Sequence, residues 1–248
     1  MLATAKRAIE RSVRLAGYEM RRIPGCTGAE YGPVQPLADY SPWATDARFQ
    51  KIYSAIKSHT LVDLYRCYEL WQLVEQTAKL PNGDVIEVGV WRGGTGGMLA
   101  TRCLSLGLDS RVYLCDTFTG VVKADEAEKI YAGGEHSDTS VAIVKALVRS
   151  LRVENAVILK GIFPDDTGEM IEDSRFRFAH IDVDVYRSAK ESVEWIWPRL
   201  VIGGIMVYDD YGFQGCEGIA RLVNEQRDYG DRIIVHNLNG HAVVVKTA

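Results

Sequence analysis

Two short stretches of the chain combine an apolar run with acidic residues at its end. One run ends at Asp182 and Asp184, and the other, at 203–208, ends at Asp209 and Asp210. Apolar runs of this length, rich in Ile and Val, are typical of buried parallel strands. Open α/β sheets bind ligands at the carboxyl ends of such strands, so we expect the four carboxylates to meet at that edge.

Carboxylates gathered at one place repel one another unless a positive group joins them. A hard divalent cation such as Mg²⁺ is the natural candidate, because it prefers oxygen ligands. An Asp at the end of a strand can instead cap the helix that follows. Capping explains one Asp at each strand end but not a pair at both, so the pattern predicts a metal-binding or catalytic role.

A glycine-rich turn follows the strand predicted at 84–89 and leads into a helix. Glycine allows close approach of a ligand, and a helix start offers free N–H groups to an anion. A dinucleotide-binding fingerprint needs a second glycine where Trp91 stands, and Trp would crowd a pyrophosphate. Glu87, two residues before Gly89, suits a ligand with an ammonium or sulfonium group.

Asp116 ends the next predicted strand, at 111–116, and lies 27 residues after Gly89. An acidic residue in this place commonly holds the ribose hydroxyls of an adenosine-type cofactor, although it can also cap a loop. The segment 118–140 that follows is rich in glycine and charge, and its length predicts a mobile lid. His136 within it is more commonly a solvated loop residue than a site residue.

Composition and charge narrow the class of protein. The chain has 248 residues and a net charge of −4, which gives no electrostatic reason to expect a nucleic acid partner. Its five cysteines form no CxxC pair and predict reduced thiols in a cytoplasmic protein. No apolar run approaches the ~20 residues of a membrane span, so no integral membrane segment is expected.

The N-terminal region predicts helical structure outside the sheet. Apolar residues on one stripe and basic residues elsewhere predict an amphipathic helix at 3–22, which we expect to dock on a second subunit in a homo-oligomer. The segment 24–47 is rich in Pro and Gly and predicts an irregular linker. Apolar spacing predicts a helix at 60–79. We therefore divide the chain into a helical extension and lid, 1–80, and a core, 81–248.

The remainder alternates strand and helix and ends in a hairpin. Helices are predicted near 187–199 and 217–228, and an Asn-Gly turn joins two final strands at 232–236 and 242–245. The other strands are predicted near 84–89, 111–116, 156–160, 177–183 and 203–208. This order predicts an α/β fold with a doubly wound, mostly parallel, Rossmann-like sheet and a C-terminal antiparallel hairpin.

Together these motifs resemble the class I S-adenosylmethionine-dependent methyltransferases. More narrowly, residues 57–230 are similar to the macrocin O-methyltransferase (TylF-type) family, metal-dependent enzymes that methylate sugar hydroxyls. The resemblance is carried by His59-Thr60, Ile86-Glu87-x-Gly89-Val90-Trp91-Arg92-Gly93-Gly94, Asp116-Thr117-Phe118-x-Gly120, Gly161-Ile162-Phe163-Pro164-Asp165, Asp182-x-Asp184-x-Tyr186, and Gly203-Gly204 with Asp209-Asp210-Tyr211-Gly212.

The resemblance implies a role for each site residue. Residues lining the methionine part of S-adenosylmethionine would be Glu87, Gly89, Trp91 and Gly93, with Thr60 reaching over from the lid. Asp116 would bind the ribose, and Gly161, Ile162 and Phe163 would pack near the adenine. Asp182, Asp209 and Asp210 would hold Mg²⁺. Asp184, on the same strand face as Asp182, would be the candidate base.

This assignment agrees with the chemistry of hydroxyl methylation. A sugar hydroxyl is a poor nucleophile at neutral pH, whereas a chelated cation lowers its pKa and a nearby carboxylate takes the proton. Two adjacent acceptor oxygens would complete the metal's coordination, so we expect a vicinal diol on a sugar or glycosylated natural product. Three alternatives stay open: a catechol-type enzyme acting on an aromatic diol, an NAD-dependent oxidoreductase, and a non-catalytic adenosine binder.

Overall fold

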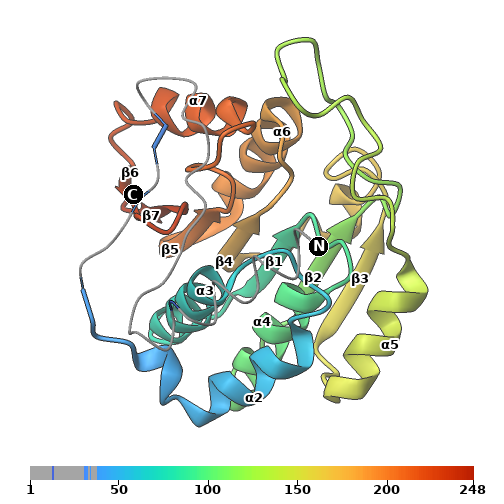
Figure 1. Ribbon diagram of the computed structural model, residues 1–248, viewed down its shortest axis with the longest axis vertical. Coiled ribbons are helices and arrows are strands. Elements are labelled where there is room, and N and C mark those ends of the chain that lie inside the picture. Colours follow the sequence, from blue (N-terminus) through green and yellow to red (C-terminus); the bar gives the residue numbers. More distant parts are fainter. Residues whose placement is uncertain (1–12, 14–30, 33, 35–37) are drawn as a thin grey trace. The chain divides into compact units, whose positions relative to one another are not determined.

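A seven-stranded mixed sheet runs through the chain (Figure 1). Its strands are β1 (Asp84–Val88), β2 (Val112–Asp116), β3 (Ala156–Lys160), β4 (Phe176–Ile181), β5 (Leu200–Tyr208), β6 (Arg232–His236) and β7 (Ala242–Lys246). Their order is β3-β2-β1-β4-β5-β7-β6. The first five strands are parallel, and β7 runs antiparallel to both β5 and β6. The predicted doubly wound sheet with a terminal hairpin is confirmed.

The structure is a computed structural model that describes Val13, Tyr31, Gly32, Val34 and residues 38–248. The chain divides into two units, Met1–Leu37 and Ala38–Ala248, and the sheet belongs entirely to the second. Apart from Val13, the helix predicted at 3–22 lies outside the described residues, as does most of the linker before residue 38. Those two expectations therefore stay predictions.

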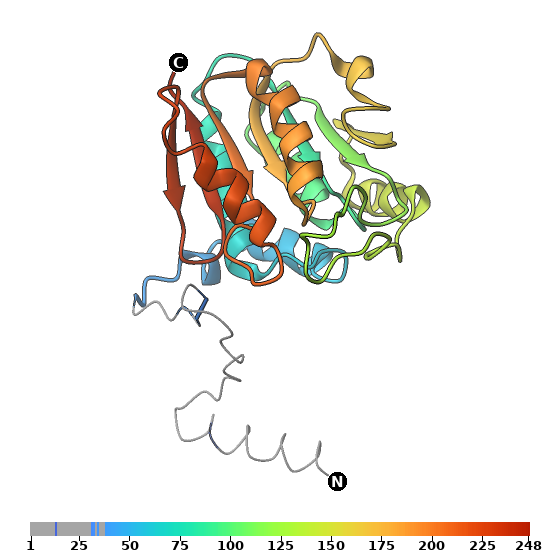
Figure 2. The same ribbon diagram turned by 90° about the horizontal axis from the view of Figure 1, so that it is seen from above.

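Helices cover both faces of the sheet (Figure 2). One face carries α2 (Ala47–Ile56), α3 (Leu64–Thr77), α4 (Gly94–Ser105) and α5 (Val141–Leu151). The other carries α6 (Tyr186–Ile196) and α7 (Glu217–Glu225). The described residues also form three short 3₁₀ turns, η1 (Pro42–Ala44), η2 (Gly168–Ile171) and η3 (Trp197–Arg199).

The α2 helix was not predicted from the sequence. Asp46 caps its start, because its carboxylate accepts hydrogen bonds from the backbone N–H groups of Arg48 and Phe49 at 3.0 and 2.9 Å. The helix buries Phe49, Ile52 and Ile56. The helix has ten residues and three buried positions. An apolar pattern this short is difficult to distinguish in the sequence from the irregular linker that precedes it.

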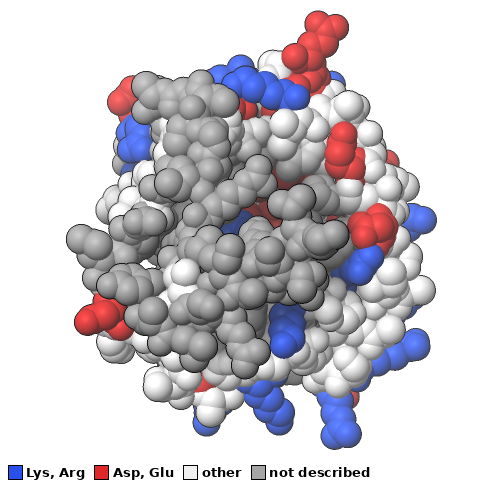
Figure 3. Space-filling model, viewed as in Figure 1, with Lys and Arg blue, Asp and Glu red and all other residues white. Residues whose placement is uncertain are grey.

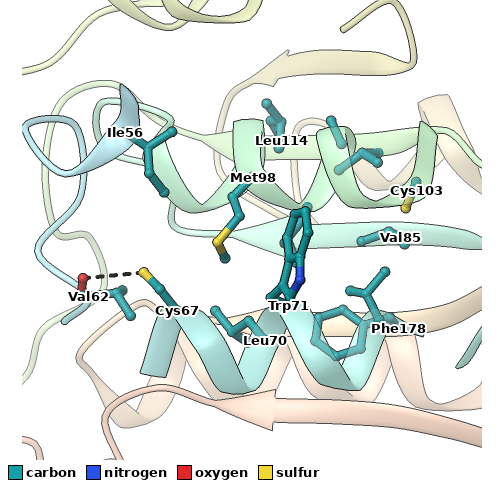
Figure 4. Close-up of a cluster of buried hydrophobic side chains, with 14 of the residues drawn as sticks. Ile56, Val62, Cys67, Leu70, Trp71, Val85, Met98, Cys103, Leu114 and Phe178 are labelled. Atoms are coloured by element: carbon teal, nitrogen blue, oxygen red, sulfur yellow. Dashed lines mark hydrogen bonds between the residues drawn. The ribbon is translucent and has the colours of Figure 1, made fainter. Parts of the chain in front are cut away.

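The helices before residue 80 share one hydrophobic core with the sheet. In Figure 4, Leu70 and Trp71 of α3 point toward Met98 of α4 and Val85 of β1. All four side chains are buried. Residues 47–77 therefore pack as part of the core, whereas the division into lid and core at residue 80 stays a prediction about function.

The parallel register brings four strand ends together at one edge. Val88 of β1 lies opposite Cys115 of β2 on one side and Ile181 of β4 on the other. Ile181 in turn lies opposite Tyr208 of β5. The order of strands reverses between β1 and β4, which is the switch point where doubly wound sheets bind ligands. No helix among the described residues is long and apolar enough to cross a membrane.

Candidate active site

A cavity of about 350 Å³ opens at this edge of the sheet. Its volume lies within the range of small-molecule sites. Ten of the predicted site residues line it: Thr60, Gly89, Trp91, Asp116, Gly161, Phe163, Asp182, Asp184, Asp209 and Asp210. Three predicted residues do not line it: Glu87, Gly93 and Ile162.

On the face seen in Figure 3, exposed charged side chains of both signs project from the periphery.

Three carboxylates form a group suited to a cation. Asp182, Asp209 and Asp210 can each place one oxygen within 4.8 Å of the others. Burial and the charges of its two neighbours raise the pKa of Asp182 well above its ordinary value. Burial and the charges of Asp184 and Asp209 do the same for the pKa of Asp210. Within residues 38–248, neither Asp182 nor Asp210 forms an ion pair, so the donor set fits a hard cation such as Mg²⁺.

Asp209 differs from these two because positive or donating groups surround it. Its Oδ1 lies 2.8 Å from His241 Nε2 and 3.4 Å from His180 Nε2, and its Oδ2 accepts a hydrogen bond from Arg66 Nη1. Burial alone would raise the pKa of Asp209, but hydrogen bonds from both histidines and the charge of Arg66 outweigh it and lower that pKa. Asp209 is therefore held ionised.

Arg66 reaches the site because of the way α3 begins. Asp63 caps the helix by accepting hydrogen bonds from the backbone N–H groups of Tyr65 and Arg66. The same carboxylate accepts a hydrogen bond from Arg66 Nε at 2.8 Å, which directs the guanidinium toward Asp209. Arg66 also lies over the ring of Phe213, 4.5 Å from its centroid.

Asp184, the candidate base, has an unusual backbone conformation. Its φ is +65°, in the left-handed region that non-glycine residues rarely adopt, and such strain often marks functional sites. Its N–H donates to Asp210 Oδ2 at 3.0 Å, and its Oδ1 accepts a hydrogen bond from Tyr131 Oη at 2.5 Å. Burial raises the pKa of Asp184 despite the hydrogen bond from Tyr131.

The expected reason for placing Asp184 beside Asp182 was wrong. We expected strand alternation to put both side chains on one face, but β4 ends at Ile181. Both carboxylates reach the cavity because the turn after β4 holds Asp184 in its left-handed conformation, not because a strand continues to residue 183.

The glycine-rich turn serves the protein's own backbone as well as the cavity. Gly89 has a φ of +88°, and a Cβ added there would lie 1.6 Å from the carbonyl oxygen of Asp182. At the start of α4, the N–H of Gly94 donates to the carbonyl of His59 at 2.8 Å, so this group is not free for an anion. That contact brings Thr60 to the cavity. Gly93 is the N-cap of α4 and packs against Val144.

Glu87 lies inside the core and not in the cavity wall. Its side chain is fully buried, and Oε1 lies 3.0 Å from His180 Nδ1. Its Oε2 has no hydrogen-bond partner among the described residues. Burial would lower the pKa of His180, but hydrogen bonds with Asp209 and Glu87 raise it to about 10. Glu87 therefore holds His180, and its contact with a cofactor stays a prediction.

Asp116 organises the turn and also lines the cavity. Its Oδ2 accepts hydrogen bonds from the N–H groups of Val90 and Trp91 at 2.7 and 2.8 Å, and its Oδ1 accepts one from Phe118 at 2.6 Å. The loop-capping alternative thus has a structural basis. Because Asp116 also lines the cavity, a ribose contact remains compatible with this arrangement and stays a prediction.

The residues predicted near an adenine follow β3. Gly161 donates its N–H to the carbonyl of Asp116 at 3.0 Å, which ties the ends of β2 and β3 together. Phe163 packs against Trp195 with ring centroids 5.1 Å apart. The N–H of Ile162 donates to Asp166 Oδ2 at 2.7 Å, and its side chain does not line the cavity.

Several residues of the site were not predicted from the sequence. We call Asp182, Asp184, Asp209 and Asp210 together the acidic cluster. Four residues that were not predicted contact it: Arg66, Tyr131, His180 and His241. His180 carried a detectable signal, since it stands two residues before Asp182 in the same apolar run. His136, interpreted as a solvated loop residue, lines the cavity.

Comparison with known proteins identifies the family of this chain. A sequence model of the family described as Macrocin-O-methyltransferase (TylF) matches residues 38–240. The 8-demethyl-8-(2,3-dimethoxy-alpha-L-rhamnosyl)-tetracenomycin-C 4'-O-methyltransferase of Streptomyces olivaceus is 31% identical over 171 residues, which are 64% of this chain and 65% of that protein. The demethyldecarbamoylnovobiocin O-methyltransferase of Streptomyces niveus is 29% identical over 203 residues, 74% of each chain.

A solved structure supports the fold. The O-methyltransferase NovP superposes with a TM-score of 0.62 at 24% identity, covering 77% of this chain and 83% of NovP. The chain spans just under two thirds of the length of the tetracenomycin relative. Because the family match extends over most of the described sheet and its acidic edge, the chain belongs to the macrocin O-methyltransferase (TylF) family of S-adenosylmethionine-dependent methyltransferases.

Proposed function

We propose that this chain transfers the methyl group of S-adenosylmethionine to a hydroxyl of a sugar or glycosylated natural product, with Mg²⁺ held by Asp182, Asp209 and Asp210. One observation carries the proposal. Asp182 and Asp210, which form no ion pair within residues 38–248, lie with Asp209 in one group, and all three line the cavity at the switch point of the sheet together with Asp184. The names of two relatives support the class of acceptor, because one name contains a rhamnosyl group and the other contains demethyldecarbamoylnovobiocin.

Different residues of the cavity are proposed to bind the acceptor and the cofactor. We assign the acidic residues to the acceptor and the residues after β1, β2 and β3 to the cofactor, and both sets line the same cavity. Mg²⁺, when bound, lowers the pKa of an acceptor hydroxyl and orients it. Asp184 takes the proton from that hydroxyl, since its Oδ1 already accepts a hydrogen bond from a hydroxyl, that of Tyr131.

The proposed acceptor carries a vicinal diol, because two adjacent oxygens would complete the coordination of the cation. A second candidate is an aromatic diol, as in catechol-type enzymes. It is favoured by two aromatic residues that line the cavity next to the cluster, Tyr131 and Phe213. Comparing turnover of a rhamnosyl glycoside with turnover of a catechol separates the two candidates.

Metal removal tests the proposed function. After exhaustive treatment with EDTA, turnover should disappear and return on addition of Mg²⁺. Binding of S-adenosylhomocysteine, measured by calorimetry, should stay within a few-fold because the cation serves the acceptor. Full activity in EDTA contradicts the metal-dependent mechanism. Binding of NADH but not of S-adenosylhomocysteine contradicts the methyltransferase assignment.

We also propose that the chain assembles as a homo-oligomer through its basic N-terminal segment and that residues 118–140 act as a lid. Residues 118–140 contact both α6 and α7. The Glu128 carboxylate accepts a hydrogen bond from the first N–H of α6, that of Tyr186, at 2.9 Å, and Lys129 pairs with Glu217 of α7 at 3.0 Å. Light scattering tests the assembly. Hydrogen exchange of residues 118–140 with and without ligands tests the lid.

A further inference from the structure

A buried histidine, His241, connects the acidic cluster to helix α3. The His241 side chain is fully buried, and its two ring nitrogens each face a carboxylate. Nε2 lies 2.8 Å from Asp209 Oδ1, and Nδ1 lies 2.5 Å from Glu69 Oε2. These three residues come from different parts of the chain: Glu69 lies in α3, Asp209 directly follows β5, and His241 directly precedes β7.

Glu69 is itself fixed by the turn of the C-terminal hairpin. The side-chain amides of Asn237 and Asn239 both donate to its carboxylate, the latter at 2.7 Å. Within the turn, the N–H of His241 donates to Asn239 Oδ1 at 3.1 Å, and the N–H of Asn237 donates to the carbonyl of His241 at 2.9 Å. The turn therefore holds His241 from its backbone, and Glu69 holds it from its ring.

This arrangement restricts how Asp209 can present its oxygens. A free carboxylate rotates about its last side-chain bond and can exchange Oδ1 with Oδ2. Here His241 engages Oδ1 and Arg66 engages Oδ2, so the rotation is blocked. Oδ1 also lies 3.4 Å from His180 Nε2, so the second lone pair of Oδ2 is the one that Asp209 keeps for a cation shared with Asp182 and Asp210.

We propose that Glu69 and His241 form a positioning pair that orients Asp209 as a ligand of the divalent cation, an inference that rests on the proposed function. Hydrogen-bonding partners behind metal ligands commonly set ligand orientation, and their loss typically lowers metal affinity by about 10–100-fold. The competing explanation is that the pair only attaches the hairpin to α3. Under that explanation its loss lowers stability without a specific effect on metal binding.

Two substitutions at one position separate these explanations. In His241→Gln, the amide nitrogen takes roughly the place of Nε2 and retains a donor toward Asp209. In His241→Asn, the amide reaches only the place of Nδ1, so the contact with Glu69 is kept and that with Asp209 is lost. Both variants remove the imidazole ring. His236→Asn is the control, because His236 is an exposed hairpin histidine that packs against Tyr211 and does not contact Asp209.

The measurement is Mn²⁺ binding to the full-length protein, followed by electron paramagnetic resonance of the free ion, with no cofactor or acceptor present. We expect His241→Asn to bind Mn²⁺ about 10–100-fold more weakly than the unmodified chain. His241→Gln and His236→Asn should stay within about threefold. Thermal unfolding and S-adenosylhomocysteine affinity, measured on the same samples, report the fold and the cofactor site.

Two results would overturn the positioning role. One is unchanged Mn²⁺ affinity in His241→Asn. The other is an equal loss in the Gln and Asn variants that parallels their loss of thermal stability, since that is the behaviour of a purely structural contact. A different result bears on the proposed function: if the unmodified chain binds no Mn²⁺, the metal site itself is wrong, and the positioning role fails with it.

Discussion

The hydroxyl of Tyr131 donates a hydrogen bond to Asp184 Oδ1 at 2.5 Å. Tyr131 belongs to the segment 118–140, and Asp184 is the candidate base that follows β4. Burial and the charge of Asp184 raise the pKa of Tyr131 far above its ordinary value, so the phenol keeps its proton. A tyrosine hydroxyl therefore occupies the position on the base that an acceptor hydroxyl would need.

Removing this hydroxyl should favour the acceptor. We expect Tyr131→Phe to lower the acceptor KM by about three- to tenfold, because a competing hydrogen bond to a charged group contributes on the order of 1.5–3 kcal/mol and part of it is replaced by water. S-adenosylhomocysteine affinity should not change. Steady-state kinetics with the acceptor varied measure the effect.

Tyr186→Phe is the matched control for Tyr131→Phe. The Tyr186 hydroxyl also donates to a carboxylate, that of Glu225 at 2.8 Å, but this pair is exposed and does not line the cavity. Its removal should leave the acceptor KM unchanged. If Tyr131→Phe instead lowers kcat more than tenfold with an unchanged KM, the phenol takes part in turnover and does not merely occupy the base.

Neutralising two neighbouring carboxylates should change stability in opposite directions. Asp210 suffers repulsion from Asp184 and Asp209, so Asp210→Asn should raise the thermal midpoint in EDTA by about 2–4 °C, on the order of 1 kcal/mol. Asp209 is paired with Arg66 and both histidines, so Asp209→Asn should destabilise the protein by about 3–5 kcal/mol.

Both variants should lose turnover, because both residues are proposed cation ligands. Differential scanning calorimetry in EDTA, with parallel activity assays in Mg²⁺, measures the two effects on the same samples. Equal destabilisation by the two substitutions is the outcome that contradicts an uncompensated charge at Asp210.

Asp116→Ala should weaken binding of S-adenosylmethionine by about 1.5–3 kcal/mol. Its carboxylate lines the cavity and holds the N–H groups of Val90 and Trp91, so the substitution removes a proposed ribose contact and loosens the turn beside it. Asp84→Ala is the control, since Asp84 accepts a hydrogen bond from Arg111 at the opposite edge of the sheet. Calorimetry showing unchanged cofactor affinity would remove Asp116 from the site.

Gly89→Ala should be among the most damaging single substitutions in the chain. The added Cβ would lie 1.6 Å from the Asp182 carbonyl oxygen, at a backbone φ of +88°, so β1 and the turn after β4 must move apart. We expect a loss above about 3 kcal/mol in unfolding free energy, together with loss of metal binding. Urea denaturation measures the first effect.

Gly107→Ala separates backbone strain from the steric clash. Gly107 has a φ of +68°, and no atom of the described residues lies within 4 Å of an added Cβ, so the left-handed conformation is what opposes Ala. That cost is about 1–2 kcal/mol. A similar cost at both positions would show that the approach of Asp182 to Gly89 does not limit the fold.

The acidic edge could be predicted from the sequence because it depends on local order along the chain. Apolar runs followed by Asp182 and Asp209 identify buried strands and their ends, and parallel strands bring those ends to one edge. The same reasoning identified the hairpin from its Asn-Gly turn. Boundaries were less exact, since β4 ends two residues before the predicted limit of 183.

Only the tertiary structure decided which groups surround each carboxylate. Arg66 and His241 are separated from Asp209 by 143 and 32 residues, and Tyr131 from Asp184 by 53, so no local period connects them. Glu87 shows the converse, because its place beside the glycine-rich turn suggested a ligand contact whereas β1 directs its side chain to His180 in the core. The sequence by itself determined that the acidic residues meet. Long-range packing decided that Asp209 is compensated and that Asp182 and Asp210 are not, because the charge state of a buried carboxylate depends on its neighbours in space.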